Sequence, residues 1–336
     1  MESAYRRYYI LDIFNLWGVV VVRRNAVLAF IYFILSIAIL STEYRLGALE
    51  VRSSLYSGFY HGQLGEYVYN GDDLASYLDW ELEPLYFVGA EFDFEFDTGL
   101  YARADFSAGI PGTVGTIEDS DWADEDDPSI KTHFSAHDNV LTGALSSRLQ
   151  LGYQHWVSEK ISLSAALGLS LMYFHMDAVD GYLEYPPGSE KVDSYGVGIS
   201  YRQFYRIPHI GIGLATDRRR SLVFSSELLF SPFAACDAVD NHHKKGLDYY
   251  DFMRNGLFFA VEMGMDLELA PQRSFRVDLS YIVVPEYRGT SYFVCTDTIY
   301  DNGCSYEGYV SPTYTDAAGA SLTLFGLSLG YRIELQ

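Results

Sequence analysis

The sequence predicts an all-β protein, a ten-stranded antiparallel up-and-down transmembrane β-barrel with long external loops. Apolar and polar residues alternate along stretches such as 257–269, 275–283 and 327–335, so each strand has one apolar and one polar face. Several stretches exceed the ~5–6 residues of a typical globular strand, whereas membrane barrels use strands of ~10 residues that extend beyond the membrane. The chain also contains 29 Tyr, 21 Phe and 29 Gly among 336 residues. Together these features favour one membrane barrel over two soluble domains.

The N-terminal segment is expected to lie outside the barrel. Arg23 and Arg24 precede the almost wholly apolar residues 26–40, which is the basic-then-apolar layout of a secretory signal. The apolar run is shorter than the ~20 residues of a comfortable membrane-spanning helix. We therefore expect residues 1–42 to be a signal peptide with its lead-in, and residues 43–336 to be the barrel. An uncleaved N-terminal anchor is the alternative.

Short and long connections between the expected strands alternate along the rest of the chain. Tight polar turns are expected at 97–99, 158–160, 217–219 and 271–273, and long connections at about 61–73, 111–138, 179–193, 237–248 and 291–314. An up-and-down barrel requires this alternation. The expected strands are, roughly, 45–60, 74–96, 99–110, 139–157, 160–178, 194–216, 220–236, 249–270, 273–290 and 315–335. Ring closure leaves no unpaired strand edge, and the alternation gathers every long connection at one end.

Charge and cysteine content limit the partners and the compartment. The net charge of −22 argues against nucleic acid and anionic membrane surfaces as partners and favours cations or basic polypeptides. Cys295 and Cys304 flank a short polar stretch, and both a disulfide between them and two unpaired thiols fit that spacing. Cys236 is expected to be free.

Acidic residues and a histidine from distant segments are expected to meet at one rim of the barrel. Asp119 and Asp121 fall in the second long connection, Asp240 and His242 in the fourth, and Glu66 in the first. An Asp-x-His pair on an extended chain places both side chains on one face, where the carboxylate can fix the imidazole tautomer. Such a histidine can take a proton from water while the aspartate pair stabilises developing charge. The pattern predicts a hydrolase that activates water without a covalent intermediate.

Other interpretations of these residues remain open. The acidic segment also fits a solvated loop that binds cations weakly. Asp119, Asp121 and Asp124 resemble a calcium loop only in part, because the glycine of the sharp turn and the glutamate at position twelve are absent. His242 and His243 would point to opposite faces of a strand and so would not share a metal ion. No P-loop, dinucleotide fingerprint or zinc signature occurs, and we expect no metal site.

Six motifs in consistent order resemble the omptin family of outer-membrane proteases, from residue 62 to residue 335. The matching segments are Glu66–Tyr69 with Ser76–Trp80, Gly109–Pro111 leading to Asp119-Ser120-Asp121-Trp122, Ser135-Ala136-His137, Tyr201–Gly211, Asp240-Asn241-His242 and Arg288–Tyr292. The D-x-D-W, S-x-H and D-x-H elements are each common, but their shared order is specific. The resemblance implies an endopeptidase groove at the mouth of a barrel that projects beyond the membrane.

By position, the resemblance implies a role for each acidic residue and for the histidine. Asp119 and Asp121 match the aspartate pair, and Asp240 with His242 matches the Asp–His dyad that activates water. Glu66 matches the acidic residue at the base of the pocket for the basic residue before the scissile bond. The implied activity is that of an aspartic-class endopeptidase that cleaves basic peptides or proteins next to basic residues. The alternative is a barrel of the same kind that serves as an adhesin or receptor for cationic partners without turnover.

The resemblance also implies a lipid partner and shows departures. Family members depend on bound lipopolysaccharide, and Arg202 and Arg206 lie in a matching stretch, so we expect lipopolysaccharide or another lipid but no other cofactor. A second acidic pocket residue is here Ala238, with Asp237 one position out of register; we expect Asp237 to share in substrate binding. The chain ends in Gln336 rather than an aromatic residue. We expect a monomer in the outer membrane of a Gram-negative-type bacterium, with its active site facing outside.

Overall fold

The computed structural model describes residues 49–124, 126–216, 221–297 and 306–335. The chain divides into two compact units, residues 50–95 with 99–336 and residues 1–49 with 96–98; the larger unit carries the barrel and is described by itself. The expected signal segment, residues 1–42, lies outside the described residues. Among those described, no helix is long and apolar enough to cross a membrane.

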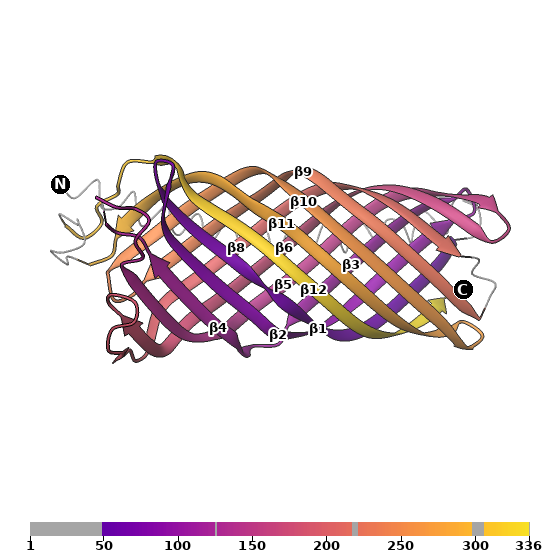
Figure 1. Cartoon of the computed structure of the whole chain (residues 1–336). Helices are drawn as coiled ribbons and strands as arrows, with labels where there is room; N and C mark the ends of the chain where they lie inside the picture. The colour runs from indigo at the N-terminus through magenta and orange to yellow at the C-terminus, as the bar shows by residue number, and fades with distance from the viewer. Residues whose placement is uncertain (1–48, 125, 217–220, 298–305, 336) are drawn as a thin grey trace, which may run out of the picture. The chain divides into compact units, whose positions relative to one another are not determined.

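Strands make up most of the described residues (Figure 1). They are β1 (Leu49–Asn70), β2 (Asp73–Phe96), β3 (Leu100–Gly109), β4 (Gly112–Asp121), β5 (His133–Ser158), β6 (Ile161–Glu184), β7 (Val192–Asp193), β8 (Val197–Thr216), β9 (Leu222–His242), β10 (Leu247–Ala270), β11 (Arg273–Cys295) and β12 (Tyr314–Leu335). The described strands pair with one another in antiparallel fashion.

The sheet closes on itself as a ring. β1 pairs with β12 from Val51–Leu335 to Val68–Ala318. β3 and β4 both lie between β2 and β5, so they form one strand that is interrupted at Pro111, which has no N–H for the ladder. The two-residue β7 pairs only with β6 among the described strands. The described strands therefore fill ten positions of an all-β antiparallel ring, which confirms the predicted fold class.

Several expected long connections are strands instead. β1 and β2 cover nearly all of the expected connection at 61–73, and only Gly71 and Asp72 join them. Gly71 has a left-handed backbone conformation with φ +64°, which glycine adopts without strain. β4 and the start of β5 occupy much of the second, and β9 and β10 much of the fourth. Polar composition suggested loops there, but neighbouring strands continue alongside and satisfy the backbone groups. The turns at 97–99, 158–160 and 271–273 are confirmed, whereas 217–219 lies outside the described residues.

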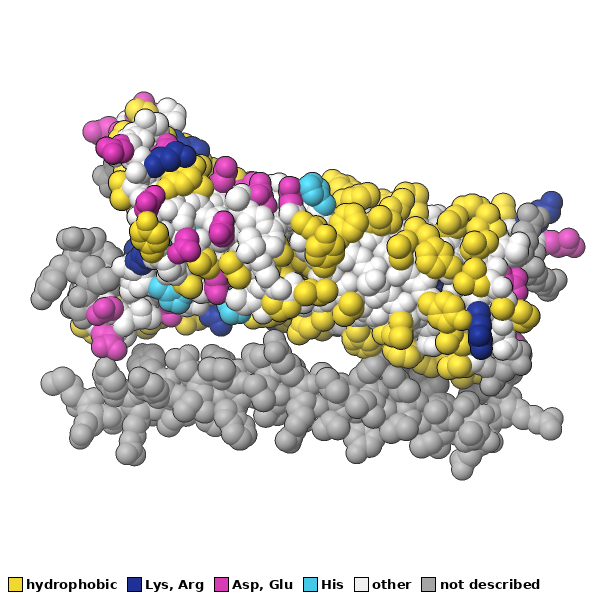
Figure 2. Space-filling view, turned by 90° about the horizontal axis from the view of Figure 1, so that it is seen from below, with side chains coloured by type: hydrophobic (Ala, Val, Ile, Leu, Met, Phe, Trp, Pro, Cys, Tyr) yellow, Lys and Arg dark blue, Asp and Glu magenta, His cyan; other side chains and the backbone are white. Residues whose placement is uncertain are grey.

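The outer surface of the barrel separates into an apolar and an acidic region. Figure 2 shows hydrophobic side chains over much of the barrel and acidic side chains gathered towards one end. Alternate residues of the strands expose large apolar side chains, among them Leu151, Leu163, Leu167, Ile212, Leu228, Phe259, Met263 and Leu329. An outward apolar band of this kind is what a strand needs where it faces lipid.

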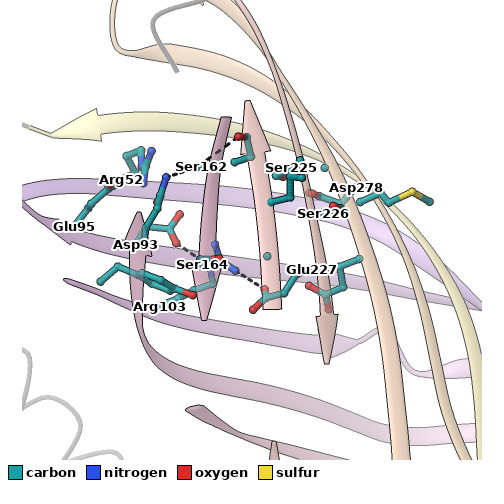
Figure 3. Close-up of a pocket in the computed structure, with 18 of the residues that line it drawn as sticks. Arg52, Asp93, Glu95, Arg103, Ser162, Ser164, Ser225, Ser226, Glu227 and Asp278 are labelled. Atoms are coloured by element: carbon teal, nitrogen blue, oxygen red, sulfur yellow. Dashed lines mark hydrogen bonds and ion pairs between the residues drawn. The ribbon is translucent and has the colours of Figure 1, made fainter. Parts of the chain in front are cut away.

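Paired charges fill the interior at the level of the pocket drawn in Figure 3. Arg103 donates to Asp93 at 2.8 Å and to Glu227 at 3.0 Å, and Arg52 donates to Glu95 at 2.8 Å. The cavity between these side chains measures only about 80 Å³. Buried charges persist when they are paired and hydrogen-bonded, so this network both fills the barrel and joins opposite walls. Such an interior does not resemble a wide channel.

A layer of buried aromatic side chains lies beside Glu66 in the interior of the barrel. Trp80 stacks on Tyr201 with ring centroids 5.4 Å apart, and both side chains are buried. Gln203 donates to the Tyr201 hydroxyl at 2.7 Å and to the Gly65 carbonyl at 3.3 Å. The Tyr205 hydroxyl donates to the side-chain amide oxygen of Gln203, Oε1, at 2.9 Å. These bonds fix β8 against β1 directly beside Glu66.

Candidate active site

A cavity of about 710 Å³ opens among seven of the strands, β1, β2, β4, β9, β10, β11 and β12, and the residues next to them. Carboxylates, one histidine and one lysine supply most of its charge. These lining residues are Glu66, Asp119, Asp121, Asp240, His242, Lys245 and Asp251. All five acidic and histidine positions predicted from the sequence for catalysis or for the pocket base are therefore brought together. The family role of each remains a prediction.

The Asp240–His242 pair has the geometry expected of an extended Asp-x-His segment. His242 Nε2 lies 2.5 Å from Asp240 Oδ2, and Asp240 is buried. The edge of the His242 ring meets Tyr249, with centroids 5.4 Å apart. With the proton on Nε2 directed at the carboxylate, Nδ1 keeps a lone pair that can accept a proton. The pair can therefore serve as a general base.

Asp119 and Asp121 project from β4, not from a loop. β4 is held between β2 and β5, where Asp119 stands opposite Leu78 on one side and Ser135 on the other. Ser76 Oγ lies 3.4 Å from Asp119 Oδ1. Burial, followed by the charge of Asp121, raises the pKa of Asp119 above the usual aspartate range. Protonation of Asp119 relieves this repulsion.

Electrostatics couple the aspartate pair to the opposite wall. Lys245 and His242 act to lower the pKa of Asp119, and Asp240 acts to raise it. Lys245 lies in the turn between β9 and β10 and lines the cavity, a position that sequence reasoning did not single out. Its cationic charge partly offsets the surrounding carboxylates.

Glu66 lies in the wall next to the dyad. Its side chain is buried, and Trp80 Nε1 approaches its Oε2 at 3.4 Å. Burial first, then the charges of Asp240 and Asp251, raises the pKa of Glu66 well above its usual range. A carboxyl in such a place is most easily ionised when a cation enters beside it.

Asp251 is a further cavity carboxyl that the sequence did not reveal. It lies on β10, is 7% exposed, and stands directly opposite Ala238 of β9. Burial raises the pKa of Asp251 to about 7, with Asp240 adding to the effect and a hydrogen bond from Ser291 opposing it. The polar segment 237–248 predicts a connection, so the sequence does not fix the register of Asp251 against β9. The inward alternation of Tyr249, Asp251 and Met253 was the available signal.

Asp237, which the sequence places among the substrate-binding residues, is not among the residues that line this cavity. Strand alternation turns Cys236 and Ala238 inward and Asp237 outward. Arg206 Nη2 contacts the Asp237 carboxylate at 2.6 Å and Arg254 Nη2 contacts it at 2.5 Å. The carboxylate is therefore already neutralised on the outer face.

The expected lipid-binding arginines, the residues of the S-x-H element and Cys236 do not line the cavity. Arg202 also faces outward and donates to Asn241 Oδ1 at 2.9 Å, so a lipid contact by Arg202 and Arg206 stays a prediction. Ser135 and His137 bond to each other at 3.1 Å, and Ser135 braces β5 opposite Asp119. Among the described residues, no group of three or more His, Cys, Asp or Glu is arranged to hold a metal ion. Cys236 is free and buried.

Cys295 is disulfide-bonded. Cys304, for which the sequence left open both a disulfide with Cys295 and a free thiol, lies outside the described residues. Cys295 ends β11, and its backbone N–H donates to the Tyr309 carbonyl at 2.9 Å.

Comparison with known proteins identifies the family. The solved outer-membrane protease OmpT from Escherichia coli has 17% sequence identity and a TM-score of 0.76, covering 87% of this chain and 99% of OmpT. The outer-membrane protein OprG from Pseudomonas aeruginosa matches with 9% identity and a TM-score of 0.34, over 87% of this chain and 99% of OprG. No curated protein matches. The model of the Omptin family matches residues 48–334, and this outer-membrane β-barrel therefore belongs to the Omptin family.

Proposed function

We propose that this protein is an outer-membrane endopeptidase of the aspartic class that hydrolyses peptide bonds next to basic residues. The observation that carries the proposal is the meeting of Asp240–His242 with Asp119 and Asp121 in one cavity. These two pairs come from β9 and β4, which are far apart in the sequence. Family membership and the OmpT-like fold support the same activity.

In the proposed reaction, water attacks the scissile carbonyl directly. His242 Nδ1 takes a proton from the water while Asp240 stabilises the imidazolium through Nε2. The water oxygen bonds to the carbonyl carbon, and the negative charge moves to the carbonyl oxygen. A protonated carboxyl of the Asp119–Asp121 pair donates a hydrogen bond to that oxygen. Collapse breaks the C–N bond, and His242 returns its proton to the leaving amine.

The charge of the cavity supports basic peptides or proteins as substrates. Glu66, Asp240 and Asp251 lie in one wall, and an entering guanidinium or ammonium group would relieve their mutual repulsion. We also propose that the cavity faces outside the cell, that residues 1–42 direct export, and that the monomer requires lipopolysaccharide or another lipid at the outward-facing arginines.

The test is cleavage of a quenched fluorescent peptide that contains Arg-Arg, by the refolded protein with and without lipopolysaccharide. His242→Ala is compared with His243→Ala, because His243 points outward to Ser200 at 2.8 Å. Asp119→Asn is compared with Glu118→Gln, its exposed neighbour on β4. We expect kcat to fall by roughly 10²–10⁴ in His242→Ala and Asp119→Asn, and to stay within about twofold in both control variants.

Two outcomes would contradict the proposal. Equal rates for His242→Ala and His243→Ala would remove the dyad from the reaction. A folded protein that cleaves nothing under either lipid condition, yet retains basic peptides, would favour the adhesin or receptor function instead.

A further inference from the structure

The pairing of β9 with β10 places a carboxylate beside a position that lacks one. Position 238 lies on the inward face of β9, two residues before Asp240, and holds a buried alanine. In the antiparallel ladder, its partner on β10 is Asp251. Directly opposite residues in such a ladder have Cβ atoms ~4.5–5.5 Å apart and share one face. The Asp251 carboxylate therefore projects from the same patch of wall as a side chain at position 238.

The surroundings of Asp251 hold it at the cavity. Ser291 stands opposite Asp251 on β11 and hydrogen-bonds to its carboxyl. Asp251, Ser291 and Glu66 all line the cavity that contains the dyad. Ala238 is buried and contributes only a methyl group at its position on β9. Glu66 and Asp251 thus approach the same space from β1 and β10.

Packing in the core of the barrel does not explain why a carboxyl group, that of Asp251, occupies this position. Asp251 is 7% exposed, and a buried carboxyl is unfavourable without a partner for its charge. The charge of Asp251 acts on Glu66, and the charge of Asp240 acts on both. A cationic side chain between Glu66 and Asp251 would be paired with both carboxylates at once.

We propose that Asp251, together with Glu66, binds the basic side chain of the substrate residue that precedes the scissile bond, and supplies the carboxylate that position 238 lacks. The inference rests on the proposed endopeptidase function and adds a specificity-determining residue to it. Asp251 reaches the pocket from β10 and Glu66 reaches it from β1. The pocket therefore has a carboxylate on two sides, although position 238 of β9 has none.

The experiment measures selection between two quenched peptides that differ in one residue. One peptide has arginine before the scissile bond, and the other has citrulline, which keeps the shape and loses the charge. The wild-type protein should prefer the arginine peptide, and Asp251→Asn should lower the kcat/KM ratio of arginine to citrulline by about tenfold or more. Asp248→Asn is the matched control, because Asp248 is on the opposite face of the same strand.

A second variant transfers the carboxylate from position 251 on β10 to the facing position 238 on β9. Ala238→Asp combined with Asp251→Asn should restore most of the preference for arginine, because the two positions share one patch of wall. This rescue also answers the concern that Asp251→Asn merely damages the fold. The loss should appear mainly in KM for the arginine peptide, while kcat for the citrulline peptide stays within about threefold of wild type.

Failure of the inference differs from failure of the proposed function. Wild-type protein that cleaves neither peptide would overturn the endopeptidase function. Wild-type cleavage with an unchanged arginine-to-citrulline ratio in Asp251→Asn would overturn only the role of Asp251. An equal fall in kcat for both peptides would also overturn it, since Asp251 would then act through Asp240 rather than on the substrate.

Discussion

Replacing Asp251 by asparagine should stabilise the barrel at neutral and alkaline pH. Burial raises the pKa of Asp251 from 3.8 to about 7, so the folded protein binds a proton there that the unfolded chain releases. Stability from this proton is complete below about pH 4 and is lost as the pH rises towards 7. At about 1.4 kcal/mol for each pH unit, ionised Asp251 lowers the free energy of unfolding by up to about 4 kcal/mol. Asparagine at this position carries no charge at any pH.

The assay is equilibrium unfolding in denaturant at pH 5 to 9, with the protein refolded in detergent micelles. Trp80 is fully buried beside Glu66 and Trp122 lines the cavity, so the change in tryptophan fluorescence on unfolding includes the loss of the cavity wall. The stability of Asp251→Asn relative to wild type should rise with pH and level off above about pH 7. Asp248→Asn should follow the wild-type curve.

Parallel curves for wild type and Asp251→Asn over this pH range would refute the reasoning. They would mean that Asp251 ionises in the folded barrel as easily as in the unfolded chain. A stabilised variant that also loses selection for arginine would show that the pocket trades stability for binding, as functional sites often do.

Two further predictions concern residues outside the cavity. Asp237→Asn should leave kcat/KM for the Arg-Arg peptide within about twofold of wild type, because its ion pairs with Arg206 and Arg254 lie on the outer face; a fall of tenfold would return Asp237 to the substrate site. In unfolded protein kept free of reductant, Cys236 should react with an alkylating reagent and Cys295 should not, as measured by peptide mass spectrometry. Alkylation of both before reduction would exclude the disulfide.

The barrel could be predicted because its signals are local and repeated. Alternation such as that of 257–269 records which face of a strand meets lipid, and ring closure follows from the need to pair every strand edge. The extent of the strands was harder to predict. The polar segment around Asp119 predicts a loop. It forms strand β4 instead, because β2 and β5 extend on either side of it and pair with its backbone.

In the candidate site, contacts within one strand could be predicted from the sequence, whereas contacts between strands could not. Asp240 and His242 share a face by alternation within one strand, so their contact followed from spacing alone. Asp237 and Asp251 depend on facing and on register between strands. The place of Asp237 in the substrate pocket was implied by the family resemblance alone, whereas alternation from Asp240 turns it to the opposite face. The place of Asp251 depends on the register of β10 against β9, which the sequence does not give.

The most direct test of the central claim is the rate at which His242→Ala cleaves the Arg-Arg peptide, measured against His243→Ala under identical lipid conditions. The account predicts that His242→Ala is slower by roughly 10²–10⁴ while both variants unfold at the same denaturant concentration. Cleavage by His242→Ala at the rate of His243→Ala would contradict water activation by the Asp240–His242 pair.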